Sequence, residues 1–169
     1  MQPPSVTTPH LLLRPPEPGD VDPLFEIQGN ADAMRYTYFA PSREATAEYV
    51  RSYADRFTQD GFAPWTAVLR SEERVVGWGG LSRDPKMPEW GIEVSYFIHP
   101  AYWRRGLASE LVRASLEYAA SLGISEVGAF TRPANLASRT VLLKAGFRYV
   151  RYVPELERDQ YAHGQSVDR

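Results

Sequence analysis

A strand, a glycine turn and an amphipathic helix follow one another in the middle of this chain of 169 residues, and this succession limits the possible folds more than any other feature. Residues 90–99 (WGIEVSYFIH) are rich in β-branched and aromatic side chains, and Pro100 ends the run, as is typical of a β-strand. Apolar side chains then recur at three- or four-residue intervals from Leu107 to Leu122, which predicts a helix that ends at Gly123. The chain must therefore fold so that the end of a strand leads directly into the N-terminus of a helix.

Before this segment, the sequence predicts one short strand, two helices and a hairpin. Asp20 is expected to cap the first helix and Ser42 the second, because their side chains can accept hydrogen bonds from a first helical turn. The predicted elements, in chain order, are a strand at Leu11–Arg14, helices at Val21–Gln28 and Arg43–Asp60, and paired strands at Trp65–Leu69 and Val75–Leu81. The apolar face expected on the second helix consists of Ala47, Val50, Ala54 and Phe57.

After the central helix, strands and a helix alternate. The predicted elements are a strand at Val127–Thr131, a helix at Asn135–Ala145, and strands at Phe147–Val153 and Arg158–His163. The pattern as a whole predicts a mixed α/β (α+β) sheet with helices on its faces. The length fits a single domain over residues 1–169, in which the proline-rich residues 1–9 are expected to be an extended, loosely ordered N-terminus.

The turn between the central strand and helix has the chemistry of a phosphate site. The first turn of a helix leaves N–H groups unpaired and carries the positive end of the helix dipole, so it attracts anions. Gly106 lets the backbone approach an oxygen without a Cβ in the way, Ala108 keeps the next approach small, and Arg104 and Arg105 add positive charge. The segment is neither a P-loop nor a G-x-G-x-x-G fingerprint. From these residues alone, an ordinary surface loop remains the alternative.

The composition argues against several classes of protein. The formal net charge of −2 provides no general field for binding nucleic acid or a membrane surface. Cysteine is absent, which excludes disulfides, thiolate metal sites and a cysteine nucleophile and is compatible with a cytoplasmic location. The three histidines are far apart in sequence, so no metal site is expected. No apolar run approaches the roughly 20 residues of a membrane span, and residues 1–10 do not have the pattern of a secretory signal.

Two segments together complete a family pattern. Trp103–Ala108 (WRRGLA) matches the Q/R-x-x-G-x-G/A phosphate motif of the GCN5-related N-acetyltransferase (GNAT) superfamily at Gly106 and Ala108, with Trp103 in place of the leading glutamine or arginine. The family's second motif, N-x-x-S…G-F, is matched by Asn135, Ser138 and Gly146–Phe147. The chain therefore resembles this superfamily from about residue 10 to residue 163.

Other segments resemble one branch of the superfamily, RimJ/RimL, whose members acetylate the N-termini of ribosomal proteins. These segments are Leu11–Pro15, Met34–Tyr36, Glu93–Ile98 and the aromatic pair Tyr102–Trp103. The resemblance implies a central, mostly antiparallel sheet of six to seven strands that splays at a coenzyme A cleft, with helices on both faces. It also implies acetyl-CoA as the co-substrate and no metal.

The resemblance assigns residues to the co-substrate position by position. Backbone groups of Phe97 and Ile98 would bind the pantetheine arm as an added strand would, and Asn135 would contact the same arm. The pyrophosphate would be bound by the backbone amides of Arg104, Arg105, Gly106, Leu107, Ala108 and Ser109. A helix cap is the structural alternative for Asn135.

The implied reaction is the direct attack of an amine on the thioester in a ternary complex. An ammonium has no lone pair, so a general base is useful, and the resemblance assigns this role to Glu93. The tyrosine that many members carry four residues before Gly146, as the acid for the departing thiolate, is here Leu142, so Ser138, a water or no acid at all must serve. Ser138 is the candidate proton donor, or else a contact of the pantetheine arm. The structural alternatives are a solvated strand residue for Glu93 and an ordinary helix residue for Ser138.

The acceptor is expected to be a primary amine, foremost the α-amine of a protein or peptide N-terminus. A small-molecule amine (amino acid, polyamine or aminoglycoside) and a non-catalytic acyl-CoA sensor remain alternatives. The acceptor cleft is expected between Asp32–Ala63 and Arg83–Glu89. The acidic residues that could attract a cation there are Asp32, Glu44, Glu48 and Asp84. No nucleic-acid or membrane partner is expected, and a homodimer is possible.

Overall fold

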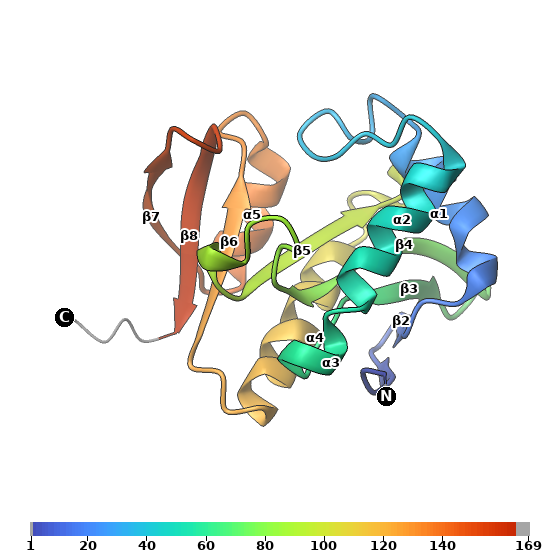
Figure 1. Ribbon diagram of the computed structural model, residues 1–169, viewed down its shortest axis with the longest axis horizontal. Helices are drawn as coiled ribbons and strands as arrows, with labels where there is room; N and C mark the ends of the chain where they lie inside the picture. Colours follow the sequence, from blue (N-terminus) through green and yellow to red (C-terminus); the bar gives the residue numbers. More distant parts are fainter. Residues whose placement is uncertain (1, 165–169) are drawn as a thin grey trace.

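The computed structural model describes residues 2–164, and within them a single sheet runs through the whole molecule (Figure 1). Its strand order is β1-β2-β3-β4-β5-β6-β8-β7, and every neighbouring pair is antiparallel except β5 and β6, which are parallel. The strands are β1 (Val6–Thr7), β2 (Leu11–Arg14), β3 (Trp65–Leu69), β4 (Arg74–Ser82), β5 (Glu93–Ile98), β6 (Glu126–Thr131), β7 (Arg148–Val153) and β8 (Arg158–Gly164). The predicted mixed, mostly antiparallel sheet is confirmed, with a short additional strand at one edge.

Five α-helices connect these strands within the described residues. They are α1 (Val21–Gln28), α2 (Arg43–Ala54), α3 (Phe57–Asp60), α4 (Leu107–Ser121) and α5 (Leu136–Lys144). Short 3₁₀ turns lie at Pro18–Asp20, Pro88–Trp90 and Pro100–Tyr102. None of these helices combines the length and the apolar character that crossing a bilayer requires.

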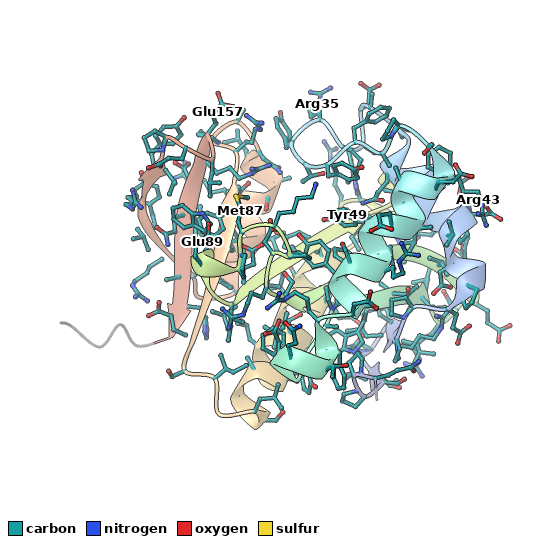
Figure 2. The ribbon with its side chains drawn as sticks, in the orientation of Figure 1. Arg35, Arg43, Tyr49, Met87, Glu89 and Glu157 are labelled. Atoms are coloured by element: carbon teal, nitrogen blue, oxygen red, sulfur yellow. The ribbon has the colours of Figure 1, made fainter. Side chains whose placement is uncertain are left out.

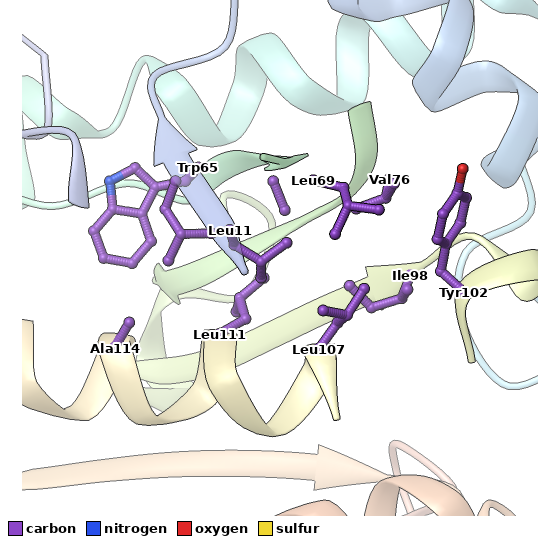
Figure 3. Packing of buried hydrophobic residues seen from close by; sticks show 11 residues of the cluster. Leu11, Trp65, Leu69, Val76, Ile98, Tyr102, Leu107, Leu111 and Ala114 are labelled. Atoms are coloured by element: carbon purple, nitrogen blue, oxygen red, sulfur yellow. The ribbon is translucent and has the colours of Figure 1, made fainter. Parts of the chain in front are cut away.

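Helix α4 packs on one face of the sheet along its apolar stripe (Figure 3). Leu107, Leu111 and Ala114 contact a buried cluster that strands β2, β3, β4 and β5 contribute. The same helix shares a second cluster with α5, β6 and β8. A third cluster joins α1 and α2 to Trp78 and Phe97, which point away from α4, so helices cover both faces of the sheet.

Two predicted helix features are wrong in detail. The helix expected from Arg43 to Asp60 is divided, because α2 ends at Ala54 and α3 begins at Phe57. Of the predicted apolar face only Val50 is buried, and it is joined by Thr46 and Tyr53, while Ala47, Ala54 and Phe57 are partly exposed. The ring of Tyr53 meets that of Trp78 edge-on at 5.2 Å, so a large aromatic surface, which a count of aliphatic residues overlooks, sets the rotation of the helix.

Asp20 lies at the start of α1 but does not cap it. Its carboxylate is 3% exposed and accepts hydrogen bonds from Arg14 Nη1 and Nη2, from the Glu17 backbone N–H and from the Thr66 hydroxyl, each at 2.8 Å. Burial alone would raise the pKa of Asp20, but these hydrogen bonds lower it below the usual value. The residue therefore joins β2, β3 and α1 through a buried ion pair. Ser42 caps α2 as predicted, accepting a hydrogen bond from the Ala45 N–H at 3.1 Å.

The N-terminal segment differs from the loose extension that the sequence predicts. Val6 and Thr7 form β1 against β2, and the Trp65 indole donates a hydrogen bond to the Pro4 carbonyl at 2.9 Å. The Glu110 carboxylate, in the first turn of α4, accepts a hydrogen bond from the His10 N–H at 2.6 Å. The segment is therefore attached to the sheet edge and to α4.

Candidate active site

Strands β5 and β6 diverge in the middle of the sheet, and a cavity of about 1450 Å³ opens there. The two strands share one register pair, Glu93 with Gly128, supported by a hydrogen bond from the Gly128 N–H to the Ile92 carbonyl at 2.8 Å. Beyond Glu93, β5 continues to Ile98 with no further pair to β6 among the described residues. Phe97 and Ile98 both line the cavity. The His99 N–H donates to the Val76 carbonyl of β4, so the alternating ladder directs the backbone groups of Phe97 toward β4 and those of Ile98 toward the free edge, where they are available to an extended ligand.

The predicted phosphate turn closes one end of this cavity. Gly106 occupies the cap position of α4 with φ +77°, and Arg104 also has a positive φ of 61°. A Cβ added to Gly106 would have nothing within 4 Å, so the space above the turn is open. The predicted phosphate residues that line the cavity are Arg104, Gly106, Leu107, Ala108 and Ser109.

Arg105 does not line the cavity. Its guanidinium lies 5.1 Å from the centre of the Tyr102 ring. The Tyr102 hydroxyl in turn donates a hydrogen bond to the Glu72 carboxylate at 2.6 Å. The Arg105 side chain therefore ties the turn to the β3–β4 hairpin.

Trp103 stands where the family motif has a glutamine or arginine, and it braces the turn. Its indole N–H donates a hydrogen bond to the Ile98 carbonyl at 2.7 Å, while the ring is half exposed in the cavity. The end of β5 and the phosphate turn are thereby held together. One lone pair of the Ile98 carbonyl is already engaged, which leaves one for an incoming ligand.

Asn135 and Ser138 meet at the N-terminus of α5, on the cavity wall. The Asn135 side chain caps the helix by accepting a hydrogen bond from the Ser138 N–H at 3.2 Å, as its structural alternative predicts. The Ser138 hydroxyl lies 2.9 Å from the hydroxyl of Tyr96 on β5. Burial raises the pKa of Tyr96 to about 12, so its phenol is protonated at neutral pH.

The sequence reasoning overlooked Tyr96. In the sequence it is one of several aromatic residues of a strand, while the position where a tyrosine was sought, Leu142, is in the core at 1% exposure. The alternating directions of the side chains along β5 could have identified Tyr96. Tyr96 has the same parity as Val94, which packs in the cluster beneath α4 and α5, so its side chain points to the side from which Ser138 comes.

Glu93 begins β5 where the two strands part, and it lines the cavity. Burial, and next the nearby charge of Asp84, raise the pKa of Glu93 to about 7, while Arg158 acts in the opposite direction. A carboxyl with this pKa exchanges its proton near neutral pH, as a general base must.

Aromatic and charged side chains from α2 and the β4–β5 loop form another wall of the cavity. Tyr49 of α2 stacks on Tyr38 with ring centres 5.0 Å apart, and burial raises the pKa of Tyr49. The Asp84 carboxylate accepts hydrogen bonds from the backbone N–H groups of Lys86 at 2.7 Å and Met87 at 3.2 Å. Figure 2 shows Tyr49 and Met87 on separate segments, α2 and the β4–β5 loop, both of which reach this cavity.

The two segments predicted for the acceptor cleft do line this wall. Among the acidic residues considered there, Asp32, Glu48 and Asp84 line the cavity and Glu44 does not. Arg158 at the start of β8 also lines it, so the wall carries both signs of charge. Within the part of the chain that the structure describes, no group of three or more histidine, aspartate or glutamate residues is arranged to hold a metal.

Comparison with known proteins identifies the class. The sequence matches the acetyltransferase (GNAT) domain family over residues 10–148, and the chain belongs to that family. It is therefore an N-acetyltransferase, as the resemblance predicts.

Relatives and solved structures agree with this class. The chain is 28% identical to the uncharacterized N-acetyltransferase YoaA of Bacillus subtilis over 148 residues, which are 86% of this chain and 83% of YoaA. An acetyltransferase structure from Agrobacterium tumefaciens has the same fold, with a TM-score of 0.83 at 19% identity over 98% of this chain and 96% of that one. RimL, a ribosomal L7/L12 α-N-protein acetyltransferase in complex with coenzyme A, has a TM-score of 0.77 at 17% identity, over 98% of this chain and all of RimL.

Proposed function

We propose that this protein transfers the acetyl group of acetyl-CoA to the N-terminal α-amine of a protein or peptide. The observation that carries the proposal is that one cavity extends from the Gly106 turn, through the gap between β5 and β6, to a carboxyl whose pKa is about 7. Its volume exceeds the roughly 300–1,000 Å³ of a typical small-molecule site, which leaves room for a donor and an acceptor together.

The donor side consists mainly of backbone groups. The amides of Gly106–Ser109, at the positive end of α4, fit a pyrophosphate. The free edge of β5 at Ile98 fits an amide group of a pantetheine arm, with the side chain of Phe97 and Asn135 also lining the cavity. Acetyl-CoA bound in this way supplies a thioester at the point where the strands part.

The acceptor amine is positioned by the other wall. Glu93 takes the proton that the ammonium must lose, directly or through water, and the freed nitrogen lone pair then attacks the thioester carbonyl carbon. As the new C–N bond forms, the C–S bond breaks, and the second proton lost by the nitrogen balances the one that the thiolate takes up. The paired hydroxyls of Tyr96 and Ser138 donate a hydrogen bond to the departing thiolate.

An amine panel tests this function. Release of the coenzyme A thiol is followed with amidated peptides bearing free N-termini, with the same peptides N-acetylated beforehand, and with amino acids, polyamines and aminoglycosides. We expect release with the free peptides only, and mass spectrometry should locate one added acetyl group on the α-nitrogen. Release with polyamines or aminoglycosides alone would overturn the peptide acceptor. Binding of coenzyme A without release by any amine would identify a sensor.

The role of Tyr96 has a separate test. Tyr96→Phe removes the hydroxyl that pairs with Ser138 and is expected to lower kcat about tenfold, since a hydrogen bond to a charged group contributes roughly 1.5–3 kcal/mol. Tyr152→Phe, an exposed tyrosine on β7, is the matched control. An unchanged kcat in Tyr96→Phe would remove this residue from the mechanism.

A further inference from the structure

Arg158 is a partly buried cation of the cavity wall without a carboxylate partner. Its side chain makes one recorded hydrogen bond, from Nη1 to the Leu156 carbonyl at 3.4 Å. No acidic group among residues 2–164 lies within 4.0 Å of its guanidinium. Its neighbour Arg132, by contrast, pairs with Glu157 at 3.4 Å. Arg158 is therefore available to a ligand in the cavity.

The alternation of the strands places Arg158 on the same face of the sheet as Glu93. Tyr161 of β8 and Val94 of β5 both pack in the cluster beneath α4 and α5. Because neighbouring side chains in a strand point to opposite faces, Arg158 and Glu93 both point away from that cluster. The two charges are close enough to influence each other, since Arg158 lowers the pKa of Glu93 and Glu93 raises that of Arg158.

Nearby carboxylates do not neutralise Arg158. The Asp84 carboxylate is bound by the N–H groups of Lys86 and Met87, and Glu93 lies beyond ion-pair distance. Removing a charge from water is costly unless the charge gains a partner, and a guanidinium offers two parallel N–H groups that match a carboxylate. Figure 2 shows Glu157, beside Arg158, at the same end of the molecule as Arg35 of the loop after α1, and Arg35 and Arg158 both line the cavity.

We propose that Arg158 binds a carboxylate of the acceptor, so that this enzyme prefers an amine that carries a carboxylate near its amino group. This inference rests on the proposed function, because it places the acceptor's amine at Glu93. The required chemistry occurs in two sources: a free amino acid, and a peptide whose first residue is aspartate or glutamate. Arg158 is thus a specificity-determining residue and takes no part in the bond changes.

Two matched substrate pairs test the proposal. Glycine is compared with glycinamide, and an amidated peptide beginning with aspartate is compared with the same peptide beginning with asparagine. We expect the wild-type protein to favour the carboxylate member of one pair, and Arg158→Gln to reduce that preference in kcat/KM about tenfold or more, chiefly through KM. A change in the peptide pair identifies an acidic N-terminus, in agreement with the peptide acceptor proposed above. A change in the glycine pair identifies a free amino acid, which would replace that peptide acceptor and keep the role of Arg158.

The comparison of ratios removes two confounding effects. The amine pKa differs between an acid and its amide, and the loss of Arg158 alters the protonation of Glu93, but both effects cancel when the ratio in Arg158→Gln is divided by the wild-type ratio. Arg132→Gln is the matched control, because Arg132 is near Arg158, pairs with Glu157 and does not line the cavity. It should leave both ratios unchanged. Arg158→Lys keeps the charge and should retain part of the preference.

The outcomes separate this inference from the proposed function. If neutral and acidic members of both pairs react equally well, and Arg158→Gln alters them equally, acetyl transfer stands and the role of Arg158 is wrong. If no amine supports release, the proposed function fails. Calorimetric titration with coenzyme A present then compares N-acetylglycine with N-acetylglycinamide. The N-acetylated peptides beginning with aspartate and asparagine are compared in the same way. Tighter binding of the acidic member of either pair, lost in Arg158→Gln, would support the inference without turnover, and equal binding in both pairs would overturn it.

Discussion

Two groups of arginine and carboxylate side chains in this molecule have opposite designs. Around Asp20, four hydrogen bonds at 2.8 Å fill the lone pairs of a carboxylate that is 3% exposed. Around Glu93, two carboxylates and Arg158 line one cavity without an ion pair among them. The pKa of Asp20 is lowered and that of Glu93 is raised, so the same chemistry stabilises the fold in one place and is left unsatisfied in the other. The difference agrees with the proposal that the group around Glu93 receives a ligand, since unpaired charges in a cavity cost stability.

The largest expected effect on stability is at Asp20, whose group is fully hydrogen-bonded. Asp20→Asn leaves the partly buried Arg14 guanidinium without its countercharge and should lower the free energy of unfolding by about 3 kcal/mol, measured by urea denaturation. Since the pKa of Asp20 is lowered on folding, the stabilisation is present above the pKa of an unfolded carboxyl and is lost as the pH falls through the folded value.

The exposed ion pair of Asp22 provides a matched control for Asp20→Asn. Asp22→Asn, whose exposed carboxylate pairs with Arg43, should change stability by less than about 1 kcal/mol. The KM for acetyl-CoA should be unaffected in both variants. A larger loss of stability in Asp22→Asn than in Asp20→Asn would contradict the stabilising role of the Asp20 carboxylate.

In the group around Glu93, which has no ion pair among its described side chains, Glu93→Gln should reduce kcat about 100-fold or more, because general base catalysis typically contributes that factor. In the wild-type protein kcat/KM should rise with pH through an apparent pKa of about 7, and the variant should lack this limb. Glu89→Gln, in the 3₁₀ turn before β5 and outside the cavity lining, is the control. An unchanged pH profile in Glu93→Gln would mean that another group accepts the proton.

The same substitution should affect stability with the opposite sign from Asp20→Asn. A folded pKa raised from 4.5 to about 7 means that the folded protein retains a proton that the unfolded chain has released, so the wild-type protein loses stability as the pH rises between these values. Glu93→Gln should therefore raise the free energy of unfolding at pH 8 by about 2–3 kcal/mol and leave it unchanged near pH 4. Chemical denaturation at pH 4 and pH 8 measures the free energy of unfolding. A loss of stability in Glu93→Gln at pH 8 would contradict the claim that the Glu93 carboxylate destabilises the folded protein there.

The smallest expected effect comes from two glycines with the same backbone conformation, only one of which lies at the cavity. Gly106 and Gly61 have φ of +77° and +78°, and a Cβ on either would have nothing within 4 Å. Alanine at either position should lower stability by about 1 kcal/mol, because an L-residue is strained in this conformation. Only Gly106→Ala should also raise the KM for acetyl-CoA, by about fivefold, through displacement of the amides of the turn. An equal rise in Gly61→Ala would disconnect the turn from the donor.

Local patterns in the sequence determined most of the elements. The period of apolar residues in α4, the glycine that begins it and the asparagine that caps α5 all depend on neighbours a few positions away. The turn at Gly106, which the proposed function assigns to the donor, was recognisable for the same reason, since it is one continuous segment. The rotation of α2 and the burial of Asp20 were missed, because they depend on contacts with Trp78 and Thr66, which are distant in sequence.

Only the tertiary structure decided which side chains line the cavity beside Glu93. Tyr49, Asp84, Glu93 and Arg158 come from α2, a loop, β5 and β8, and their sequence spacing contains no sign that they line one cavity. The proximity of Tyr96 to Ser138 likewise depends on how α5 packs against β5. The physical reason is that a pKa or a binding preference is set by burial and by charges across space, and these exist only after distant segments of the chain have been packed together.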